Sequence, residues 1–206
     1  MTLTAVVTGG SSGIGQVVVK ELRARDWNVT SLSRREGTDV SREEDVVKAF
    51  AKLKSLDALV HCAQVLIKRP LTSTTLDDWE QQVGSGLRGA FLCSREAFKF
   101  MRRRGGSIVF VSSLSGVSGA EKFPGMAAYV AAKSGLAGLT EVLAVEGKQR
   151  KIRVNAVSPG SVDTPMLRIA GVGGAVLQPA EVARIIVWLA SPESAPISGA
   201  NLRMDP

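Results

Sequence analysis

The sequence contains few of the residues that crosslink chains, bind metals or cross membranes. Its 206 residues include only two cysteines and one histidine. Cys62 and Cys93 stand apart in apolar segments and form no CxxC pair, so we expect reduced structural thiols and no metal site. No stretch approaches the about 18 uninterrupted apolar residues of a transmembrane helix, and the first residues lack the basic flank and cleavage site of a signal peptide. These absences predict a cytoplasmic protein that does not enter a membrane.

Acidic residues are in the minority. The chain has 26 lysines and arginines against 19 aspartates and glutamates, which gives a formal net charge of +7. This surplus favours anionic partners without choosing between a phosphorylated cofactor, an acidic carrier protein and a nucleic acid. The basic residues are dispersed except for Arg102-Arg103-Arg104, a run expected at a solvated helix end. Since no zinc-finger spacing, recognition helix or aromatic stripe accompanies the charge, we expect no nucleic-acid binding.

The sequence does have a regular alternation of short apolar runs and longer helical patterns. Strands are expected at residues 3–8, 28–32, 56–62, 107–111, 152–157 and 202–204. Helices are expected at residues 13–25, from Ser41 onward, and at 75–103, 128–147 and 179–190. Alternating strands and helices predict βαβ crossovers and a parallel sheet covered on both faces. Neither a repeat nor a linker divides the chain, so residues 1–206 are predicted to form a single Rossmann-type, doubly wound α/β domain.

A glycine-rich turn separates the first predicted strand from the first predicted helix. Thr8 is followed by Gly9-Gly10-Ser11-Ser12-Gly13-Ile14-Gly15, which has the spacing GxxxGxG. Glycines allow backbone N–H groups to approach a pyrophosphate closely, and a helix N-terminus adds the positive end of its dipole. Such a segment can be no more than a tight turn, but its place directly after the first strand favours a dinucleotide site.

The end of the second predicted strand bears on the kind of dinucleotide. An acidic residue there would accept hydrogen bonds from the ribose hydroxyls and would repel a 2′-phosphate. The segment Leu32-Ser33-Arg34-Arg35 contains no acid, and a guanidinium can bind a phosphate through a charge-assisted pair of hydrogen bonds. We therefore expect NADP(H) rather than NAD(H), with a solvated basic turn as the alternative.

The only tyrosine of the chain stands four residues before a lysine. On the predicted helix 128–147, Tyr129 and Lys133 share a face, as residues i and i+4 do. A free tyrosine has a pKa of about 10, and a cation about 4 Å away lowers this by at most about three units. The pair is therefore suited to acid–base chemistry, and the alternative is an exposed aromatic–lysine pair. Ser112 and Ser113 follow the strand 107–111, where a hydroxyl could bind a carbonyl oxygen.

Together these features resemble the short-chain dehydrogenase/reductase family. The glycine motif, Ser113, the Tyr129-xxx-Lys133 pair and the segment from Asn155 to Pro165 stand in the family's order and cover essentially the whole chain. The similarity is greatest to 3-oxoacyl-carrier-protein reductases and related carbonyl reductases. The resemblance implies hydride transfer between a nicotinamide and a carbonyl or secondary alcohol.

The resemblance also implies roles for individual residues. Tyr129 would be the general acid or base on the substrate oxygen, Lys133 would lower its pKa and hold the nicotinamide ribose, and Ser113 would orient the carbonyl. Tyr129 and Lys133 would also belong to the cofactor site. The other residues expected to contact the cofactor are Gly9, Ser12, Gly13, Ile14, Gly15, Ser33, Arg34, Asp39, Val40, Ala63, Pro159, Gly160, Val162 and Thr164.

Two departures from the family pattern fall near the expected reaction centre. Family members usually carry Asn-Asn-Ala-Gly where this chain has His61-Cys62-Ala63-Gln64, and we interpret His61 as a structural replacement rather than a catalyst. The family's catalytic asparagine, which helps to hold a proton-relay water, aligns with Gly86. Gly84 and Gly86 also weaken the predicted helix by roughly 1 kcal/mol each relative to alanine.

Two further departures shorten the chain. Only residues 36–38 separate Arg35 from Asp39, where the family has a helix and most of a strand, so one edge strand and its covering helix are predicted to be missing or vestigial. Residues 166–178 are few for the helical lid that covers the substrate in this family, which predicts a short substrate lid and an open pocket. The interval from Ser113 to Tyr129 is longer than usual, and its segment 123–126 could supply an apolar wall.

Three hypotheses follow. The first is an NADP(H)-dependent oxidoreductase acting on a small carbonyl or alcohol, either free or bound to a carrier. The second is a nucleotide-binding sensor or scaffold with little turnover, which Gln64, Gly86 and the short lid favour. The third, a protein associated with nucleic acid, rests on charge alone and ranks last. From the resemblance we also expect a homodimer or homotetramer formed through the long helices.

Overall fold

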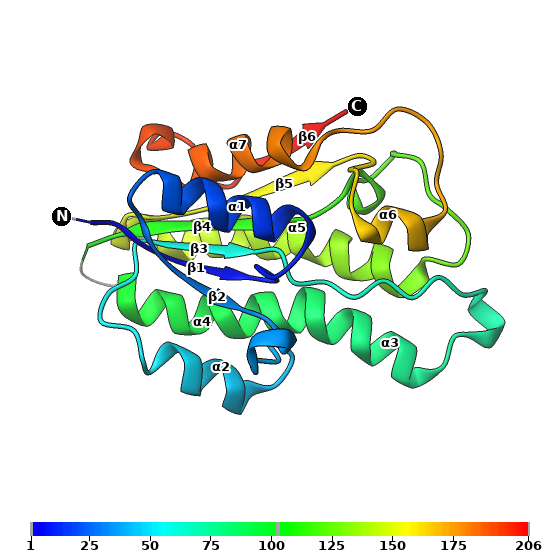
Figure 1. Cartoon of the computed structure of the whole chain (residues 1–206), viewed down its shortest axis with the longest axis horizontal. Helices are drawn as coiled ribbons and strands as arrows, with labels where there is room; N and C mark the ends of the chain where they lie inside the picture. Colours follow the sequence, from blue (N-terminus) through cyan, green and yellow to red (C-terminus); the bar gives the residue numbers. More distant parts are fainter. Residues whose placement is uncertain (1, 102–103, 206) are drawn as a thin grey trace.

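The computed structural model describes residues 2–101 and 104–205. Its centre is a six-stranded sheet with the strand order β2-β1-β3-β4-β5-β6 (Figure 1). The strands are β1 (Thr4–Thr8), β2 (Asn28–Leu32), β3 (Ala58–His61), β4 (Gly106–Val111), β5 (Ile152–Pro159) and β6 (Asn201–Met204). Every pairing is parallel. The direction of the strand order reverses at β1, and open α/β sheets bind ligands at such a point, beyond the carboxyl ends of the strands.

Helices cover both faces of this sheet (Figure 1). One face carries α1 (Gly13–Ala24) and α7 (Pro179–Ala190), and the other carries α2 (Glu43–Phe50), α4 (Gly89–Met101) and α5 (Ala127–Gly147). The central strand β1 serves both layers, because Ala5 and Val7 pack under α1 and α7 whereas Val6 packs under α2 and α4. Burial on both faces explains why the strands are continuous apolar runs. The predicted doubly wound, parallel α/β fold is confirmed.

The sheet ends at β2, as the short interval between Arg35 and Asp39 predicted. Between β2 and β3, the described residues form a 3-10 turn, Arg34–Glu36, and the helix α2, but no strand. The helix α2 packs against α4 rather than over a further strand. The strand β2 therefore has a neighbour, β1, on one side only. The predicted loss of an edge strand and its helix is confirmed.

The long helical region expected at residues 75–103 is present from Leu76 to Met101, but its middle is not α-helical. The helices α3 (Leu76–Val83) and α4 are joined by a π-helical turn, Gly84–Arg88. Glycines weaken an α-helix here, and they also permit close packing, since a Cβ on Gly89 would lie 2.9 Å from the Val40 side chain. The expectations for residues 102 and 103, at the end of this helix, lie outside the described residues.

Other boundaries differ by a few residues. The helix α2 begins at Glu43 rather than at Ser41, because the Ser41 side chain donates to Asp39 instead of capping the helix. The strand β5 continues to Pro159, and its last residues pair with β6. The helix at the position of the lid, α6 (Pro165–Ala170), has six residues and is followed by a mostly irregular segment up to α7. The predicted short lid is therefore confirmed.

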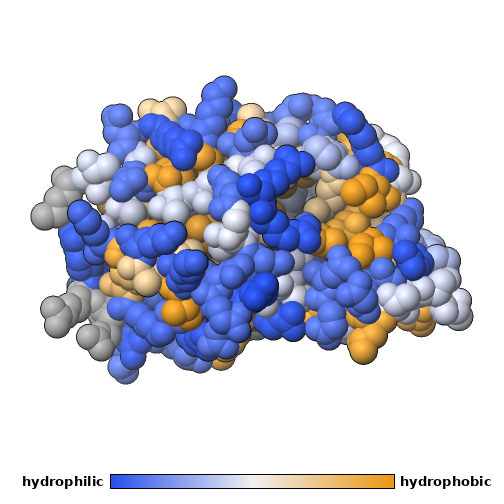
Figure 2. Space-filling model, turned by 60° about the horizontal axis from the view of Figure 1, so that its bottom comes forward, coloured by the Kyte–Doolittle hydropathy of each residue, from blue (hydrophilic) through white to orange (hydrophobic). Residues whose placement is uncertain are grey.

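The helix α5 is apolar on more than its packed side. Together with the turn after it, residues Ala127–Arg150, it is long and apolar enough to cross a membrane by length and composition alone, and 33% of its most apolar 18 residues are buried. One side of α5 packs on β5 and buries Tyr129 and Lys133, while Val142 and Val145 are exposed. Elsewhere, the face that carries α2 and α3 is mostly hydrophilic, with hydrophobic residues in separate spots (Figure 2).

Candidate functional site

The carboxyl ends of β1, β3, β4 and β5 surround a cavity of about 830 Å³. A second hollow of about 230 Å³ adjoins it near the end of β2, and both are lined by Gly9, Ser12, Arg34 and Ala63. Every residue that the sequence predicted for the site lines one or both of these hollows. Residues far apart in the sequence are thus brought to one end of the sheet. Among the described residues, no group of three His, Cys, Asp or Glu side chains is placed to hold a metal ion.

The glycine turn allows a very close approach of backbone segments. Gly9 has a φ of +68°, and a Cβ there would lie 2.9 Å from the backbone of Ala63. A Cβ on Gly15 would overlap the carbonyl oxygen of Gly9. Ser12 precedes α1 without capping it, and the first turn of α1 contains no acidic residue. The N–H groups of this helix end are therefore free for an anion, so the turn fits a pyrophosphate.

The smaller hollow lies at the end of β2 and is lined by Ser33, Arg34, Asp39 and Val40. Asp39 accepts hydrogen bonds from the backbone N–H of Ser41 at 3.0 Å and from its hydroxyl at 2.7 Å. Burial opposes ionisation of Asp39, but these hydrogen bonds and the positive charge of Arg34 lower its pKa below the ordinary value. The hollow therefore combines a fixed carboxylate with an arginine, as the sequence predicted.

One charged residue at this end was missed in the sequence. Glu36 accepts hydrogen bonds at Oε2 from the hydroxyls of Ser31 and Ser33, at 2.8 and 2.5 Å. The 3-10 turn Arg34–Glu36 and Gly37, which has a φ of +80°, fold the chain back so that this carboxylate lies beside β2. The end of β2 therefore has an acidic residue beside it, although residues 32–35 contain none. The sequence did not reveal this, because the contact between residues 31 and 36 depends on the 3-10 turn.

The reaction centre predicted from the sequence is assembled at the start of α5. Ser113 follows β4, and its hydroxyl accepts a hydrogen bond from the backbone N–H of Ser115 at 3.2 Å. Tyr129 is 8% exposed and Lys133 is 3% exposed, which excludes the alternative of an exposed surface pair. The ammonium of Lys133 lies 5.6 Å from the centre of the Tyr129 ring. Ser112 donates to the backbone carbonyl of Lys133 at 2.8 Å and so ties α5 to the end of β4.

The prediction that Lys133 lowers the pKa of Tyr129 is wrong for the protein by itself. Burial raises the pKa of Tyr129, and a hydrogen bond with Ser113 only partly opposes this. Burial also lowers the pKa of Lys133 to about 8. The physical reason is that the Lys133 ammonium donates to the backbone carbonyl of Val111, at 2.6 Å, rather than to the phenol. Tyr129 is therefore neutral at neutral pH in the protein by itself.

His61 is part of the wall behind this centre. It is 1% exposed, and its ring nitrogens contact the Thr8 hydroxyl at 2.9 Å and the carbonyl oxygen of Gly86 at 3.0 Å. Because the carbonyl only accepts, Nε2 carries the proton and Nδ1 accepts from Thr8. Burial and the nearby charge of Lys133 lower the pKa of His61 to about 3, so it is neutral. This supports the interpretation of His61 as a structural residue.

The opposite wall comes from the segment after β5. Pro159, Gly160, Val162 and Thr164 all line the larger cavity, as the sequence predicted. The backbone N–H of Gly160 donates to Met204 at 2.9 Å, which fixes this segment to β6. A single bridge pairs Val162 with a residue before α7, so the chain returns across the base of the short lid.

Apolar side chains surround Tyr129. Leu66, Met126 and Ala170 are buried with it, and Phe123 and Met166 pack against this cluster. The predicted apolar wall at residues 123–126 is therefore joined by residues from α6 and from the loop after β3, which the sequence did not single out. This arrangement surrounds the phenol with hydrocarbon and suits the apolar part of a substrate.

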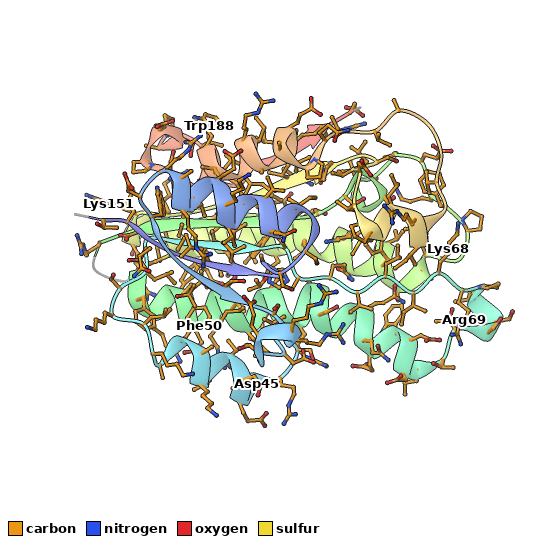
Figure 3. All side chains as sticks on the ribbon, in the orientation of Figure 1. Asp45, Phe50, Lys68, Arg69, Lys151 and Trp188 are labelled. Carbon is orange, nitrogen blue, oxygen red and sulfur yellow. The ribbon has the colours of Figure 1, made fainter. Side chains whose placement is uncertain are left out.

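The loop after β3 also holds the lid. Lys68 and Arg69 lie at the end of the molecule where α6 and the start of α3 are found (Figure 3). Lys68 donates from Nζ to the carbonyl oxygen of Ala170 at 2.6 Å, and Arg69 pairs with Asp78 at 3.3 Å. The lid is therefore short but attached to the opposite rim.

Comparisons with known proteins agree with this geometry. A family model described as enoyl-(acyl carrier protein) reductase matches residues 32–206. The trans-4-hydroxycyclohexanecarboxylate dehydrogenase of Sinomonas cyclohexanicum is 37% identical over 163 residues, which are 76% of this chain and 62% of that protein. The acetoacetyl-CoA reductase of Shinella zoogloeoides is 32% identical over 235 residues, which are 98% of this chain and 96% of that protein. A solved structure, "ElxO with NADP Bound", superposes with a TM-score of 0.88 at 29% identity and covers 100% of this chain and 98% of its own.

The extent of these matches bears on the shortened segments. The match covers less than two thirds of the Sinomonas dehydrogenase but nearly all of the Shinella reductase. The alignment with the latter runs over 235 positions although this chain has 206 residues, so that reductase has additional residues within the aligned region. The family match, these identities and the assembled Ser113, Tyr129 and Lys133 lead to one conclusion: the chain belongs to the short-chain dehydrogenase/reductase family, oxidoreductases that act on CH–OH and C=O groups.

Proposed function

We propose that this protein is an NADP(H)-dependent carbonyl reductase or alcohol dehydrogenase in which Tyr129 is the general acid or base. The observation that carries the proposal is one continuous cavity whose two ends are lined by different kinds of residues. At one end, the uncapped start of α1 and the glycine turn fit a pyrophosphate. At the other end, Ser113, Tyr129 and Lys133 converge beside an apolar cluster.

When bound, a nicotinamide cofactor supplies the hydride to a carbonyl carbon or accepts it from an alcohol. The Tyr129 hydroxyl donates its proton to the substrate oxygen during reduction and takes it back during oxidation. The Ser113 hydroxyl donates a hydrogen bond to the same oxygen as negative charge develops there. Lys133 stabilises the negative charge left on the phenol and returns a proton to it. A neutral Tyr129 suits the reducing direction, because the proton is present when the carbonyl arrives.

The proposed preference for NADP(H) rests on two guanidinium groups. Arg34 and Arg35 line both hollows at the end of β2, where a 2′-phosphate would lie. The similar solved structure, that of ElxO, has NADP bound. The Glu36 carboxylate beside Ser33 works against this preference, since it repels a phosphate. We propose that the two arginines outweigh the single acid.

The proposed substrate is a small carbonyl or secondary alcohol with an apolar body. The cluster of Leu66, Phe123, Met126 and Met166 would contact that body next to Tyr129. Two similar proteins are named for a hydroxycyclohexanecarboxylate and for an acetoacetyl thioester as their substrates. The short lid leaves room for a chain leading out of the cavity, so a carrier-bound substrate belongs to the same proposal.

We propose a homodimer or homotetramer that buries the outer sides of the long helices. Phe91 on α4 is 48% exposed, and Val142 and Val145 on α5 are 49% and 76% exposed. Covering such residues removes apolar area from water, worth about 25 cal/mol per Å². The free cysteines fit a reducing compartment, and a cytoplasmic location is proposed on that ground.

The test is oxidation of NADPH and of NADH in the presence of ketones, diketones and acetoacetyl thioesters, by the wild type and by Tyr129→Phe. NADPH-linked turnover that falls by about 10²-fold or more in the variant supports the proposal. Cofactor binding in calorimetry with no turnover of any carbonyl refutes it and supports a sensor or scaffold. The six-residue lid is the observation that favours this second function.

A further inference from the structure

The loop after β3 carries one wall of the larger cavity. Residues 62–70 form neither helix nor strand, yet Leu66 in this loop is only 6% exposed. Its side chain lies in the apolar cluster that contains Tyr129, and it lines the cavity. An irregular segment of backbone has no ladder of hydrogen bonds to fix it, so the place of this wall must be set by other contacts.

Two side chains of the helical segment after the loop supply such contacts. The backbone N–H of Val65 donates to the Ser85 hydroxyl at 3.0 Å, and that of Ile67 donates to Oε1 of Gln82 at 3.0 Å. Gln82 lies on α3 and Ser85 in the π-helical turn that follows it. These two acceptors take the place of carbonyl groups on a neighbouring strand, and they hold the backbone on both sides of Leu66.

Gln82 is the more deeply buried of the two acceptors. It is 1% exposed, whereas Ser85 is half-buried. Its amide has a single orientation, because the Ile67 N–H can only donate and the Asp78 carbonyl can only accept. Nε2 donates to that carbonyl oxygen at 3.1 Å. Breaking a buried hydrogen bond leaves its partner unpaired, which is costly. The Gln82 amide therefore fixes Ile67 from the interior of the protein.

The far end of the loop is attached separately. The backbone N–H of Arg69 donates to the carbonyl oxygen of Gly125 at 2.9 Å, and the Arg69 guanidinium pairs with Asp78 at 3.3 Å. Both contacts lie beyond Ile67. The part of the loop that carries Leu66 is therefore held by the two acceptors from the helical segment.

We propose that Gln82 is a positioning residue that limits the size of the substrate beside Tyr129 by holding Leu66 in place. The inference rests on the proposed function, in which the body of the substrate contacts Leu66. Gln82 lines neither hollow, so it acts only through the backbone of Ile67. A bulky substrate must displace Leu66, and the hydrogen bond from Ile67 to Gln82 opposes that displacement. The bond therefore favours small carbonyl compounds over bulky ones.

The first test compares Gln82→Met with Gln81→Met, the same change at an exposed neighbour on α3. The probes are butanone and cyclooctanone, and the measured quantity is the ratio of their kcat/KM values. We expect this ratio to shift toward the bulky ketone about three- to tenfold in Gln82→Met, the effect of one hydrogen bond, through KM rather than kcat. Gln81→Met should keep the wild-type ratio. An unchanged ratio in a folded Gln82→Met enzyme would overturn the inference.

Two further variants separate positioning from stability. Gln82→Glu keeps an acceptor for the Ile67 N–H, so we expect it to retain the wild-type ratio even where its melting temperature falls. Leu66→Ala removes the wall itself and should shift the ratio toward the bulky ketone. Adding Gln82→Met to Leu66→Ala should change the ratio no further, because the amide acts through Leu66. Additive shifts in the double variant, or a shift in folded Gln82→Glu as large as in Gln82→Met, would contradict the proposal.

A measurement without substrate separates this inference from the proposed function. Tyr129 is the only tyrosine of the chain and is 8% exposed, so its nitration by tetranitromethane, followed by the absorbance of nitrotyrosine, reports access to this one ring. We expect several-fold faster nitration in Gln82→Met and in Leu66→Ala, and the wild-type rate in Gln81→Met. If the rate is unchanged in Gln82→Met, the inference fails even for an active enzyme. If the rate rises as expected but no carbonyl is reduced, only the proposed function fails.

Discussion

Lys68 donates a hydrogen bond to the carbonyl oxygen of Ala170 at 2.6 Å, across 102 positions of sequence. The bond joins the loop after β3 to the last residue of α6, the only helix of the short lid in the described part of the chain. It therefore fixes the end of α6, where Ala170 is buried in the same apolar cluster as Tyr129. Apart from this bond, the six-residue helix is held by the packing of Met166 and Ala170 against the apolar cluster.

We expect Lys68→Met to loosen this lid and raise KM for the carbonyl about three- to tenfold, while kcat changes little. Methionine keeps most of the side-chain volume but cannot donate to Ala170. Steady-state kinetics measures the split between KM and kcat. Lys48→Met, an exposed change on α2, is the control. Equal KM values for the two variants would contradict a role of the Lys68 hydrogen bond in holding the lid.

Glu36→Gln is expected to strengthen the preference for NADPH over NADH. The change removes a negative charge beside Ser33 and keeps an acceptor for the Ser31 and Ser33 hydroxyls. For an exposed charge the effect is about 1 kcal/mol, or roughly a fivefold gain in the ratio of kcat/KM values. Glu44→Gln on α2 is the control. A ratio that stays the same would mean that the Glu36 carboxylate lies too far from the bound cofactor to matter.

Lys133→Met is expected to abolish turnover and stabilise the fold at neutral pH. Burial lowers the pKa of Lys133 to about 8, below its unfolded value, so folding opposes its protonation. The contribution of Lys133 to the free energy of unfolding rises as pH increases from about 8 toward 10, and it is lowest below pH 8. The variant should gain up to about 3 kcal/mol at pH 7 and much less at pH 10, as measured by urea unfolding. An equal effect at both pH values would exclude a buried charge.

His61→Asn is expected to reduce the loss of stability in acid. The pKa of His61 is about 3 in the folded protein and about 6.5 in the unfolded chain. Its contribution to the free energy of unfolding is therefore fully present above pH 6.5 and is lost as pH falls toward 3. At pH 4.5 this loss amounts to about 3 kcal/mol relative to pH 7.5. Urea unfolding at both pH values measures the difference for the two proteins. If the difference is as large in His61→Asn, other groups cause the acid sensitivity.

The sequence predicted the architecture well because its signals are local. Six apolar runs became the six strands, and the short interval before Asp39 correctly indicated the missing edge strand. The spacing of Tyr129 and Lys133 placed both on one face of α5, since that relation depends only on helix periodicity. Thr75, which caps α3 through Asp78, shows how local such boundaries are.

The features that could not be predicted depend on contacts between distant segments. Burial raises the pKa of Tyr129, and Lys133 donates to Val111 rather than to the phenol; neither follows from a spacing of four residues. Glu36 lies three positions beyond Ser33 and meets it only through a 3-10 turn. Gln64 and Gly86 read as two separate departures in the sequence, whereas in space they occupy one site.

The position of β2 at the edge of the sheet separates two parts of the molecule. In the strand order, β2 lies two positions from β3 and three from β4, which Ser113 follows. The missing edge strand therefore lies far from Ser113, Tyr129 and Lys133, which still line one cavity. In the proposed function, cofactor choice and chemistry therefore belong to separate parts of this chain, and the rim around Arg34 and Asp39 can be rebuilt for a different dinucleotide without redesign of α5.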